Sequence, residues 1–238
     1  MKTFIIHMDG DEKRAPNVQS LRAQLPNATV LPAVLGKSHL STYDLHSGTL
    51  HHPPYPFPLG AGELGCFLSH RACWKRIVDS GDDYALIVED DAHFDPARLP
   101  RLLDLIHQTA TADSYIRLPA KTRETTAGQL HQAGDMCLFL PRVIGLQTVA
   151  QIVGRTAAAR LLSATQQIDR PVDTFLQMHW ITKQPVQTIL PNGVSELTTQ
   201  LGGSTIQKRP SGNKLLRELR RSLYRYRVSR HPQTPPAK

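Results

Sequence analysis

Short runs of apolar residues alternate along this chain with segments in which apolar residues recur every three or four positions. Such runs have the length of buried strands, and the spaced segments have the pattern of helices that cover a sheet. The alternation therefore predicts an α/β sandwich. The expected strands are residues 3–8, 28–35, 84–88, 115–118, 136–140, 148–153 and 186–190, and the expected helices are residues 12–25, 62–80, 157–167 and 172–180 with another beginning near residue 96.

A long segment rich in glycine and proline, residues 36–60, interrupts this alternation. Loops of this length within a compact domain are often functional rather than simple connections. We therefore expect this segment to form a flap over a site.

The basic residues of the chain are concentrated at its C-terminal end. The 238 residues hold 28 Lys and Arg against 20 Asp and Glu, a net charge of +8, and 40% of them are hydrophobic, enough for a folded core. Residues 208–238 carry ten basic side chains and one acid, which leaves 18 basic and 19 acidic side chains for residues 1–207. A nearly neutral body does not favour nucleic-acid binding. We therefore expect a globular domain over residues 1–207 and a separate tail over residues 208–238.

The tail has the pattern of a basic amphipathic helix. Its apolar residues Leu216, Leu219, Leu223 and Tyr226 are spaced by three, four and three positions, and arginines occupy many of the positions between them. A helix of this kind suits the surface of an anionic membrane, where each basic residue contributes roughly 1 kcal/mol. Residues 208–230 are therefore predicted to bind such a surface. The alternative is that the apolar stripe packs on the body.

The sequence indicates neither a secretory leader nor a membrane-spanning segment. Its first residues hold only a short apolar run, and no run approaches the ~18 apolar residues that span a bilayer. The three cysteines, Cys66, Cys73 and Cys137, lack the spacing of a zinc or redox motif and are expected to be free thiols. These features predict a cytoplasmic protein that is peripheral on the inner face of the cytoplasmic membrane.

Three adjacent acids, Glu89, Asp90 and Asp91, follow directly on the apolar run of residues 84–88. Adjacent carboxylates repel one another, so folding alone gives little reason to place them at the end of a buried strand. In open α/β sheets ligands bind beyond the carboxyl ends of strands, and carboxylates are ligands for Mg²⁺ and Mn²⁺. The acids therefore predict a metal site that holds a diphosphate. The alternative is a helix cap or a solvated turn near Asp95.

Two blocks of residues carry a family resemblance. The more specific block runs from Gly-Glu-Leu-Gly-Cys-Phe-Leu-Ser-His at residues 62–70, through Trp74, to Tyr-Ala-Leu-Ile-Val-Glu-Asp-Asp at residues 84–91. The other is Asp-Arg-Pro-Val-Asp-Thr-Phe-Leu at residues 169–176. Weaker matches are residues 4–7 with Lys13 and Arg14, Pro191, and residues 204–206. From about residue 3 to 209, the chain resembles glycosyltransferase family 25, which includes bacterial lipooligosaccharide galactosyltransferases and collagen galactosyltransferases.

The resemblance implies a GT-A-like nucleotide-diphosphosugar transferase fold, with a central mixed and mostly parallel sheet flanked by helices. It also implies a UDP-hexose donor and Mn²⁺ or Mg²⁺, which would offset the charge that develops on departing UDP. On this basis Asp91 and Glu89 bind the metal, and Glu89 or Asp90 contacts the ribose or the water shell of the metal. Arg14, Arg170 and His70 are expected to bind the donor as well.

Transfer to an acceptor hydroxyl also needs a base, and Asp173 in the second block is the predicted catalytic base. The alternative is that Asp173 caps a helix and Asp169 is the working acid. Arg170 either binds the diphosphate or pairs with one of these acids. His70, which shares a helix face with Glu63, either contacts the substrate or makes internal hydrogen bonds.

These features together predict a glycosyltransferase that moves a hexose from a UDP-sugar to a hydroxyl of a lipopolysaccharide, a lipooligosaccharide or another surface glycan. Galactose is favoured, glucose is the alternative, and the reaction is expected to be inverting and metal-assisted. Enzymes with this fold often complete the metal shell with a late histidine, but His179 and His231 lie in no matching pattern, which leaves the third ligand open. Two other classes are a basic-tailed nucleic-acid-binding protein and a fold that binds a nucleotide sugar without turnover.

Overall fold

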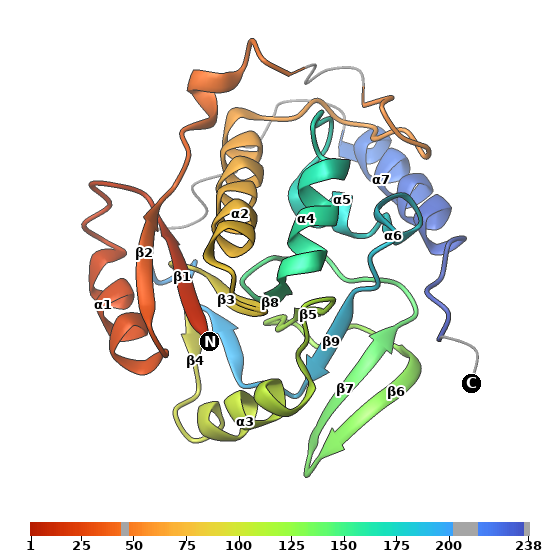
Figure 1. Ribbon diagram of the computed structural model, residues 1–238. Helices are drawn as coiled ribbons and strands as arrows, with labels where there is room; N and C mark the ends of the chain where they lie inside the picture. Colours follow the sequence, from red (N-terminus) through yellow and green to blue (C-terminus); the bar gives the residue numbers. More distant parts are fainter. Residues whose placement is uncertain (44–47, 202–213, 236–238) are drawn as a thin grey trace.

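The computed structural model describes residues 1–43, 48–201 and 214–235. Figure 1 shows a single central sheet with helices on both sides. The strands are β1 (Lys2–His7), β2 (Ala28–Pro32), β3 (Tyr84–Glu89), β4 (Ala92–Phe94), β5 (Tyr115–Arg117), β6 (Thr126–Ala133), β7 (Met136–Pro141), β8 (Ala150–Gly154), β9 (Gln187–Leu190) and β10 (Val194–Glu196). The helices are α1 (Ala15–Gln24), η1 (Gly36–His39), α2 (Ala61–Ser80), α3 (Leu99–Thr109), α4 (Arg155–Ala164), α5 (Val172–Leu176), α6 (His179–Thr182) and α7 (Lys214–Ser229).

Eight strands form the central sheet in the order β2-β1-β3-β8-β5-β9-β7-β6. The strands β1, β2 and β3 are mutually parallel, and β9 is parallel to β5. Strand β8 runs antiparallel to both β3 and β5, and β7 runs antiparallel to β9 and β6. Six strands therefore share one direction and two oppose it, which confirms the predicted mixed, mostly parallel sheet flanked by helices.

Both faces of the sheet are buried, and β3 shows how the sequence achieves this. Ala85 and Ile87 point into the core on the side of α2, α4 and α5, whereas Leu86 and Val88 point into the core on the side of α1 and α3. Successive side chains of a strand face opposite ways, so a strand covered on both faces must be continuously apolar. This explains the uninterrupted run that predicted the strand.

A close backbone approach holds α2 against the segment that follows β2. A Cβ atom added at Gly65 would lie 2.5 Å from the carbonyl oxygen of Val34. The hydroxyl of Ser69, one turn further along α2, accepts a hydrogen bond of 2.8 Å from the Val34 amide. The glycine of the first matching block is therefore required by packing.

The structure adds elements that the hydrophobic pattern did not predict. Strand β6 is largely exposed and polar, and its pairing with β7 contains two irregularities, so it carries no apolar run. Strands β4 and β10 are three residues each and pair with one another in a small second sheet. The helix expected over residues 172–180 is two short helices, α5 and α6.

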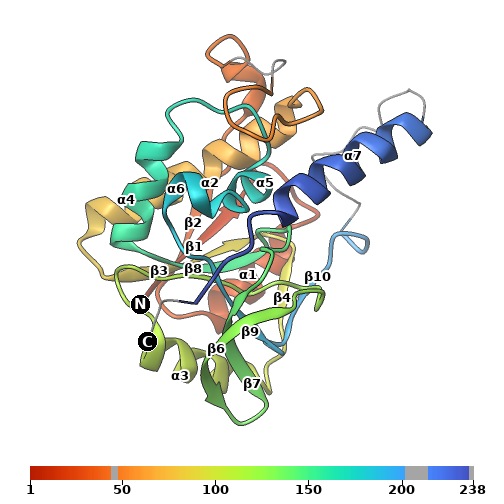
Figure 2. The ribbon, with the colours of Figure 1, turned by 90° about the vertical axis from the view of Figure 1, so that its right-hand side faces the viewer.

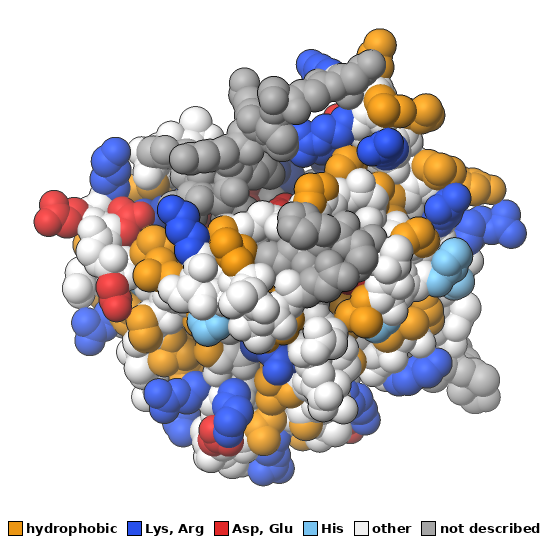
Figure 3. Space-filling model, turned by 90° about the horizontal axis from the view of Figure 1, so that it is seen from above, with side chains coloured by type: hydrophobic (Ala, Val, Ile, Leu, Met, Phe, Trp, Pro, Cys, Tyr) orange, Lys and Arg blue, Asp and Glu red, His pale blue; other side chains and the backbone are white. Residues whose placement is uncertain are grey.

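The basic helix α7 packs on the body through only part of its surface. Tyr224 and Val228 are buried, whereas Leu219, Leu223 and Tyr226 of the predicted apolar stripe are exposed. The N-terminal half of α7 projects from the body (Figure 2), and hydrophobic and basic side chains stand side by side along the edge where it projects (Figure 3). The expected boundary near residue 207 and the weak match at residues 204–206 lie outside the described residues. Among the described helices, none combines the length and the apolar character needed to cross a bilayer.

Candidate active site

The three adjacent acids lie where β3 ends beside β1. Residue Ile6 of β1 pairs with Glu89, so His7 and the acids come together at the same edge of the sheet. Side chains from the start of α1, from α2 and from the segment after β10 contact the acids at this edge. The expected placement of the acids beyond a buried strand is therefore present in the structure.

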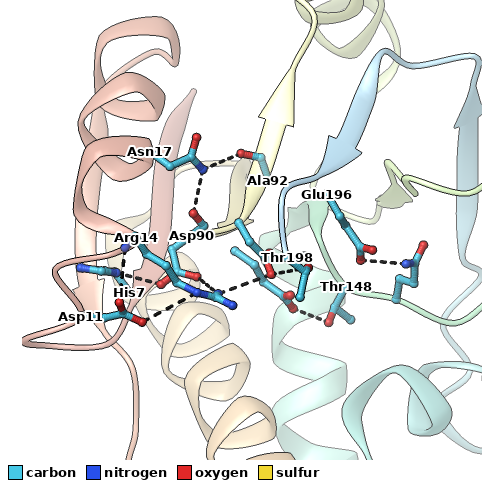
Figure 4. Close-up of polar contacts among 12 residues, drawn as sticks. His7, Asp11, Arg14, Asn17, Asp90, Ala92, Thr148, Glu196 and Thr198 are labelled. Carbon is cyan, nitrogen blue, oxygen red and sulfur yellow. Dashed lines mark hydrogen bonds and ion pairs between the residues drawn. The ribbon is translucent and has the colours of Figure 1, made fainter. Parts of the chain in front are cut away.

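Asp90 is held by two basic side chains. Its Oδ2 lies 2.8 Å from Nδ1 of His7, and its Oδ1 accepts a hydrogen bond from the guanidinium of Arg14 (Figure 4). The side-chain amide of Asn17 donates to the carbonyl oxygens of Asp90, at 2.8 Å, and of Ala92, at 2.9 Å. The backbone after β3 is thereby fixed to α1, and the Asp90 carboxylate is fully paired with protein groups.

Asp91 is bound less completely. Its Oδ2 accepts a hydrogen bond of 2.8 Å from the Thr198 hydroxyl and lies 3.4 Å from Nη1 of Arg14, but its buried Oδ1 has no hydrogen-bond partner. Burial raises the pKa of Asp91, and the neighbouring charge of Glu89 raises it further. A buried carboxylate oxygen without a donor is suited to accept a cation.

Glu89 lies at the end of a relay of buried polar side chains. The amide oxygen of Gln151 accepts a hydrogen bond from the Tyr115 hydroxyl, and its amide nitrogen donates to Nδ1 of His70 at 2.8 Å. Because Nδ1 accepts, the ring proton of His70 lies on Nε2, which is 3.1 Å from Oε1 of Glu89. The hydroxyl of Thr148 donates to the same oxygen at 2.6 Å.

The relay sets the charge state of Glu89. Burial opposes ionisation, but hydrogen bonding with His70 and Thr148 outweighs it and lowers the pKa of Glu89. Of the two alternatives for His70, internal hydrogen bonding is the one seen. Two of the acids thus have pKa values shifted in opposite directions within one site, Glu89 downward and Asp91 upward.

Asp173 is connected to Glu196 of β10 through Gln147. The backbone amide of Gln147 donates to Oδ2 of Asp173 at 3.2 Å, and its side-chain amide donates to Oε1 of Glu196 at 2.7 Å. Gln147 has a φ of +89°, a conformation that a residue with a side chain rarely adopts and that turns its side chain toward β10. Burial raises the pKa of Glu196, and so do the charges of Asp91 and Glu89. Asp173 and Glu196 therefore border the same acidic site.

Arg170 lies apart from the three adjacent acids. It is fully buried and forms a two-pronged ion pair with Asp169, with Nε and Nη2 at 2.7 and 2.9 Å from the two carboxylate oxygens. This is the pairing with a neighbouring acid that the sequence left open. The remaining contacts of the guanidinium are with the carbonyl oxygens of Gly48, His51 and Pro53, the sulfur of Met178 and the hydroxyl of Tyr224.

The two late histidines contact each other. Nε2 of His179 on α6 lies 2.9 Å from the carbonyl oxygen of His231, whose ring stacks on Trp180 at 4.2 Å between centroids. A different set of donor atoms converges nearer the acids, where ligand atoms of Cys66, His70 and Glu89 lie within 4.8 Å of one another. None of the three cysteines forms a disulfide in the structure.

Several polar residues of this site were not predicted from the sequence. His7 could have been assigned from the rule that parallel strands end at one edge, since it follows an apolar run as Glu89 does. No local signal could have identified Thr198, which binds an acid 107 positions away, or Gln147, whose role depends on its backbone conformation.

Comparisons with known proteins identify the family of this chain. A family model described as "Glycosyltransferase family 25 (LPS biosynthesis protein)" matches residues 1–176. Procollagen galactosyltransferase 2 of Homo sapiens is 28% identical over 191 residues, which cover 74% of this chain and 29% of that protein. Probable inactive glycosyltransferase 25 family member 3 of Rattus norvegicus is 32% identical over 182 residues, which cover 69% of this chain and 30% of that protein.

The chain thus spans less than a third of the length of these relatives. Among solved structures, a mannose-1-phosphate geranyltransferase from Thermus thermophilus aligns with 83% of this chain and 76% of that chain, at a TM-score of 0.41 and 10% identity. The family match covers the sheet edge, the three acids and Asp173. The chain belongs to glycosyltransferase family 25.

Proposed function

We propose that this protein is a hexosyltransferase that moves galactose, or alternatively glucose, from a UDP-sugar to a hydroxyl of a lipopolysaccharide, a lipooligosaccharide or another surface glycan. The observation that carries the proposal is the buried, unpaired Oδ1 of Asp91 at the carboxyl end of β3, within the region that matches a glycosyltransferase family. The human relative is named a galactosyltransferase, which supports galactose over other hexoses.

The residues present fit a divalent cation. Asp91 offers an oxygen without a donor, and Glu89 offers a second carboxylate whose pKa is lowered and which is therefore ionised near neutral pH. These two acids would hold Mn²⁺ or Mg²⁺. When bound, the cation would supply positive charge to the diphosphate of the donor.

The remaining side chains divide the other tasks. Arg14 and His7 fix Asp90, which keeps one acid beside the donor without exposing a further negative charge. Asp173 is proposed as the base that takes the proton of the acceptor hydroxyl while that oxygen attacks the anomeric carbon. A single displacement of this kind inverts the configuration at that carbon.

A release assay tests the proposal. Purified protein is mixed with UDP-galactose, UDP-glucose or UDP-N-acetylhexosamine, with Mn²⁺ or with chelator, and released UDP is measured. Release with one donor that is lost in chelator and in Asp91→Asn supports the proposal. A matched control is Asp95→Asn, which changes an acid outside the cluster. Release that is unchanged in Asp91→Asn would remove the metal role from this residue.

A second candidate is a protein that binds a nucleotide sugar without turnover, and the rat relative, which is named "Probable inactive glycosyltransferase 25 family member 3", favours it. It predicts that UDP raises the thermal midpoint of the protein while no donor releases UDP. Thermal shift and release in the same samples therefore separate the two candidates.

We also propose that the protein acts in the cytoplasm, peripherally on the inner face of the cytoplasmic membrane. A glycolipid acceptor would be presented at that surface, so an enzyme held there would meet it at high local concentration.

A further inference from the structure

The inward face of α7 binds the body through four residues. Tyr224 and Val228 are buried, and the guanidinium groups of Arg217 and Arg221 lie 5.4 and 5.7 Å from the centre of the Phe57 ring. The ring of Tyr55 contacts Tyr224 edge-on, with 5.5 Å between centroids. The spacing of four, three and four positions places these four helix residues on one face.

The opposite face of α7 is apolar and exposed. Leu219, Leu223 and Tyr226 each follow an inward residue by two positions, which is about 200° around an α-helix. Their exposed fractions are 66%, 47% and 59%. The stripe that the sequence predicted as amphipathic therefore points away from the body, and the side chains that anchor the helix are a different set.

Basic side chains border this outward face. Arg220 and Arg227 are exposed, and each follows an outward residue by one position. Arg230 follows the last residue of α7, and its Nη1 lies 3.4 Å from the hydroxyl of the outward residue Tyr226. Residues 214–230 hold seven basic side chains and one acid, Glu218, which pairs with Arg221. The outward face thus combines apolar and positively charged groups with little negative charge.

The helix is attached to the body close to the candidate site. The hydroxyl of Tyr224 lies 3.1 Å from Nη1 of Arg170, which is itself paired with Asp169. Val172 begins α5 two residues later, and α5 carries Asp173. A surface that binds α7 would therefore orient the element that holds the proposed base.

These observations favour one occupant for the outward face. A second copy of the chain would bring two sets of Arg220, Arg227 and Arg230 together, which costs free energy through repulsion. A nucleic acid would use the arginines but would leave the leucines in water. An anionic lipid surface uses both, because its phosphates pair with arginine while its acyl boundary accepts leucine and tyrosine.

We propose that the outward face of α7, centred on Leu219, Leu223 and Tyr226 and bordered by Arg220, Arg227 and Arg230, docks on an anionic lipid bilayer. This inference deepens the peripheral location proposed above and rests on it. The helix lies in the interface with its apolar side chains below the headgroups. Because its inward face is fixed to Arg170 and Phe57, docking holds the whole domain in one orientation.

Vesicle flotation of the full chain tests the proposal. Binding is measured with phosphatidylcholine vesicles, with and without added phosphatidylglycerol, at low and high salt. The wild-type protein should float with the anionic vesicles only, and less at high salt. The double variant Leu219→Ser/Leu223→Ser should weaken binding about tenfold or more, and Arg220→Gln/Arg227→Gln roughly 30-fold.

Matched controls come from the body of the protein. Leu40 and Leu130 have exposed fractions of 43% and 42%, close to that of Leu223, so Leu40→Ser/Leu130→Ser removes similar leucines elsewhere. Arg22 and Arg76 are exposed on α1 and α2, so Arg22→Gln/Arg76→Gln removes equal charge. Both controls should bind like the wild type.

Several results would overturn the inference. It is wrong if the wild type does not float with anionic vesicles, or if either helix variant binds as tightly as its control. It is also wrong if the leucine variant changes a dimer into a monomer in size-exclusion chromatography and leaves flotation intact. UDP release with a soluble acceptor is measured on the same preparations. For the wild type, release of UDP without flotation refutes only the docking surface, and flotation without release refutes only the proposed transferase activity.

Discussion

Replacing Asp90 and Asp91 separately by asparagine should separate folding from function at neighbouring positions. Asp90 is paired with His7 and Arg14, whereas Asp91 has one hydrogen bond, from Thr198, and one buried oxygen without a partner. Each substitution keeps the size of the side chain and removes one negative charge. The two variants therefore test whether the pairing seen in the structure decides the effect.

The two substitutions should lower the free energy of unfolding by different amounts. In Asp90→Asn, the buried guanidinium of Arg14 loses its main partner but keeps Asp91 at 3.4 Å and Asp11 at 3.8 Å. We expect the free energy of unfolding to fall by about 3 kcal/mol, the lower end for breaking a buried ion pair.

In Asp91→Asn, the amide oxygen still accepts from Thr198, so the loss is the charged part of that bond and the 3.4 Å ion pair with Arg14, together about 1 kcal/mol. Removing the negative charge of Asp91 also stabilises the folded state. Because burial and Glu89 raise the pKa of Asp91, its ionised form opposes folding at neutral pH. The two effects offset one another, and we expect a change within about 1 kcal/mol of zero.

Activity should be affected in the opposite order, with Asp91→Asn losing more activity than Asp90→Asn. If Asp91 holds the cation as proposed, loss of its carboxylate should lower transfer by about 10² to 10³, as removal of one strong electrostatic group does. Urea unfolding gives the stabilities, titration calorimetry with Mn²⁺ gives metal binding, and UDP release gives activity. The reasoning is refuted if Asp91→Asn is the more destabilising variant, or if it binds Mn²⁺ as the wild type does.

Three further predictions concern side chains around the site. Burial opposes ionisation of Glu89, but its hydrogen bond with His70 lowers its pKa below 4.5. The ionised carboxylate therefore stabilises the fold above about pH 4.5, and this stabilisation is lost as the pH falls through the lowered pKa. In Glu89→Gln, the free energy of unfolding in urea should fall less steeply below pH 4.5 than in the wild type, and an identical pH dependence would contradict this. Asp173→Asn should reduce the rate of transfer by about 10²-fold to 10⁴-fold with little change in thermal midpoint. Full activity in this variant would show that another residue is the base. Tyr224→Phe should cost about 1–2 kcal/mol, since Arg170 loses an acceptor, and should speed proteolysis within α7; unchanged stability and proteolysis would show that the hydroxyl is not needed to hold the helix.

The sequence predicted the buried elements well because a buried element must be composed largely of apolar residues. Strand β3 is apolar throughout since it faces a core on each side, and β1 follows the same rule. Strand β6 was missed because its side chains are mostly exposed and its pairing is irregular. Strands β4 and β10 exist only through their mutual pairing, which joins residues about 100 positions apart and leaves no local pattern.

The helix α7 shows a second limit of pattern analysis. Its apolar stripe was predicted, but a stripe does not say which face a helix turns to its own protein. The inward face contains Arg217 and Arg221, which hydropathy counts as polar and which nevertheless lie over the Phe57 ring. Contacts between groups far apart in the sequence therefore decided the orientation.

Three adjacent acids are equivalent in the sequence, and their partners make them different. Consecutive residues at the end of a strand project in different directions, so each carboxylate meets its own element. Glu89 reaches His70 on α2, and Asp90 reaches Arg14 at the start of α1. Asp91 reaches the segment after β10, where the Thr198 hydroxyl donates to Oδ2 of Asp91 and Oδ1 has no hydrogen-bond partner. A fully paired carboxylate gains little from a cation, whereas an unpaired buried one gains most, because the cation removes the cost of its desolvation. The pairing pattern therefore selects Asp91 as the acid on which metal binding and transfer should depend most strongly.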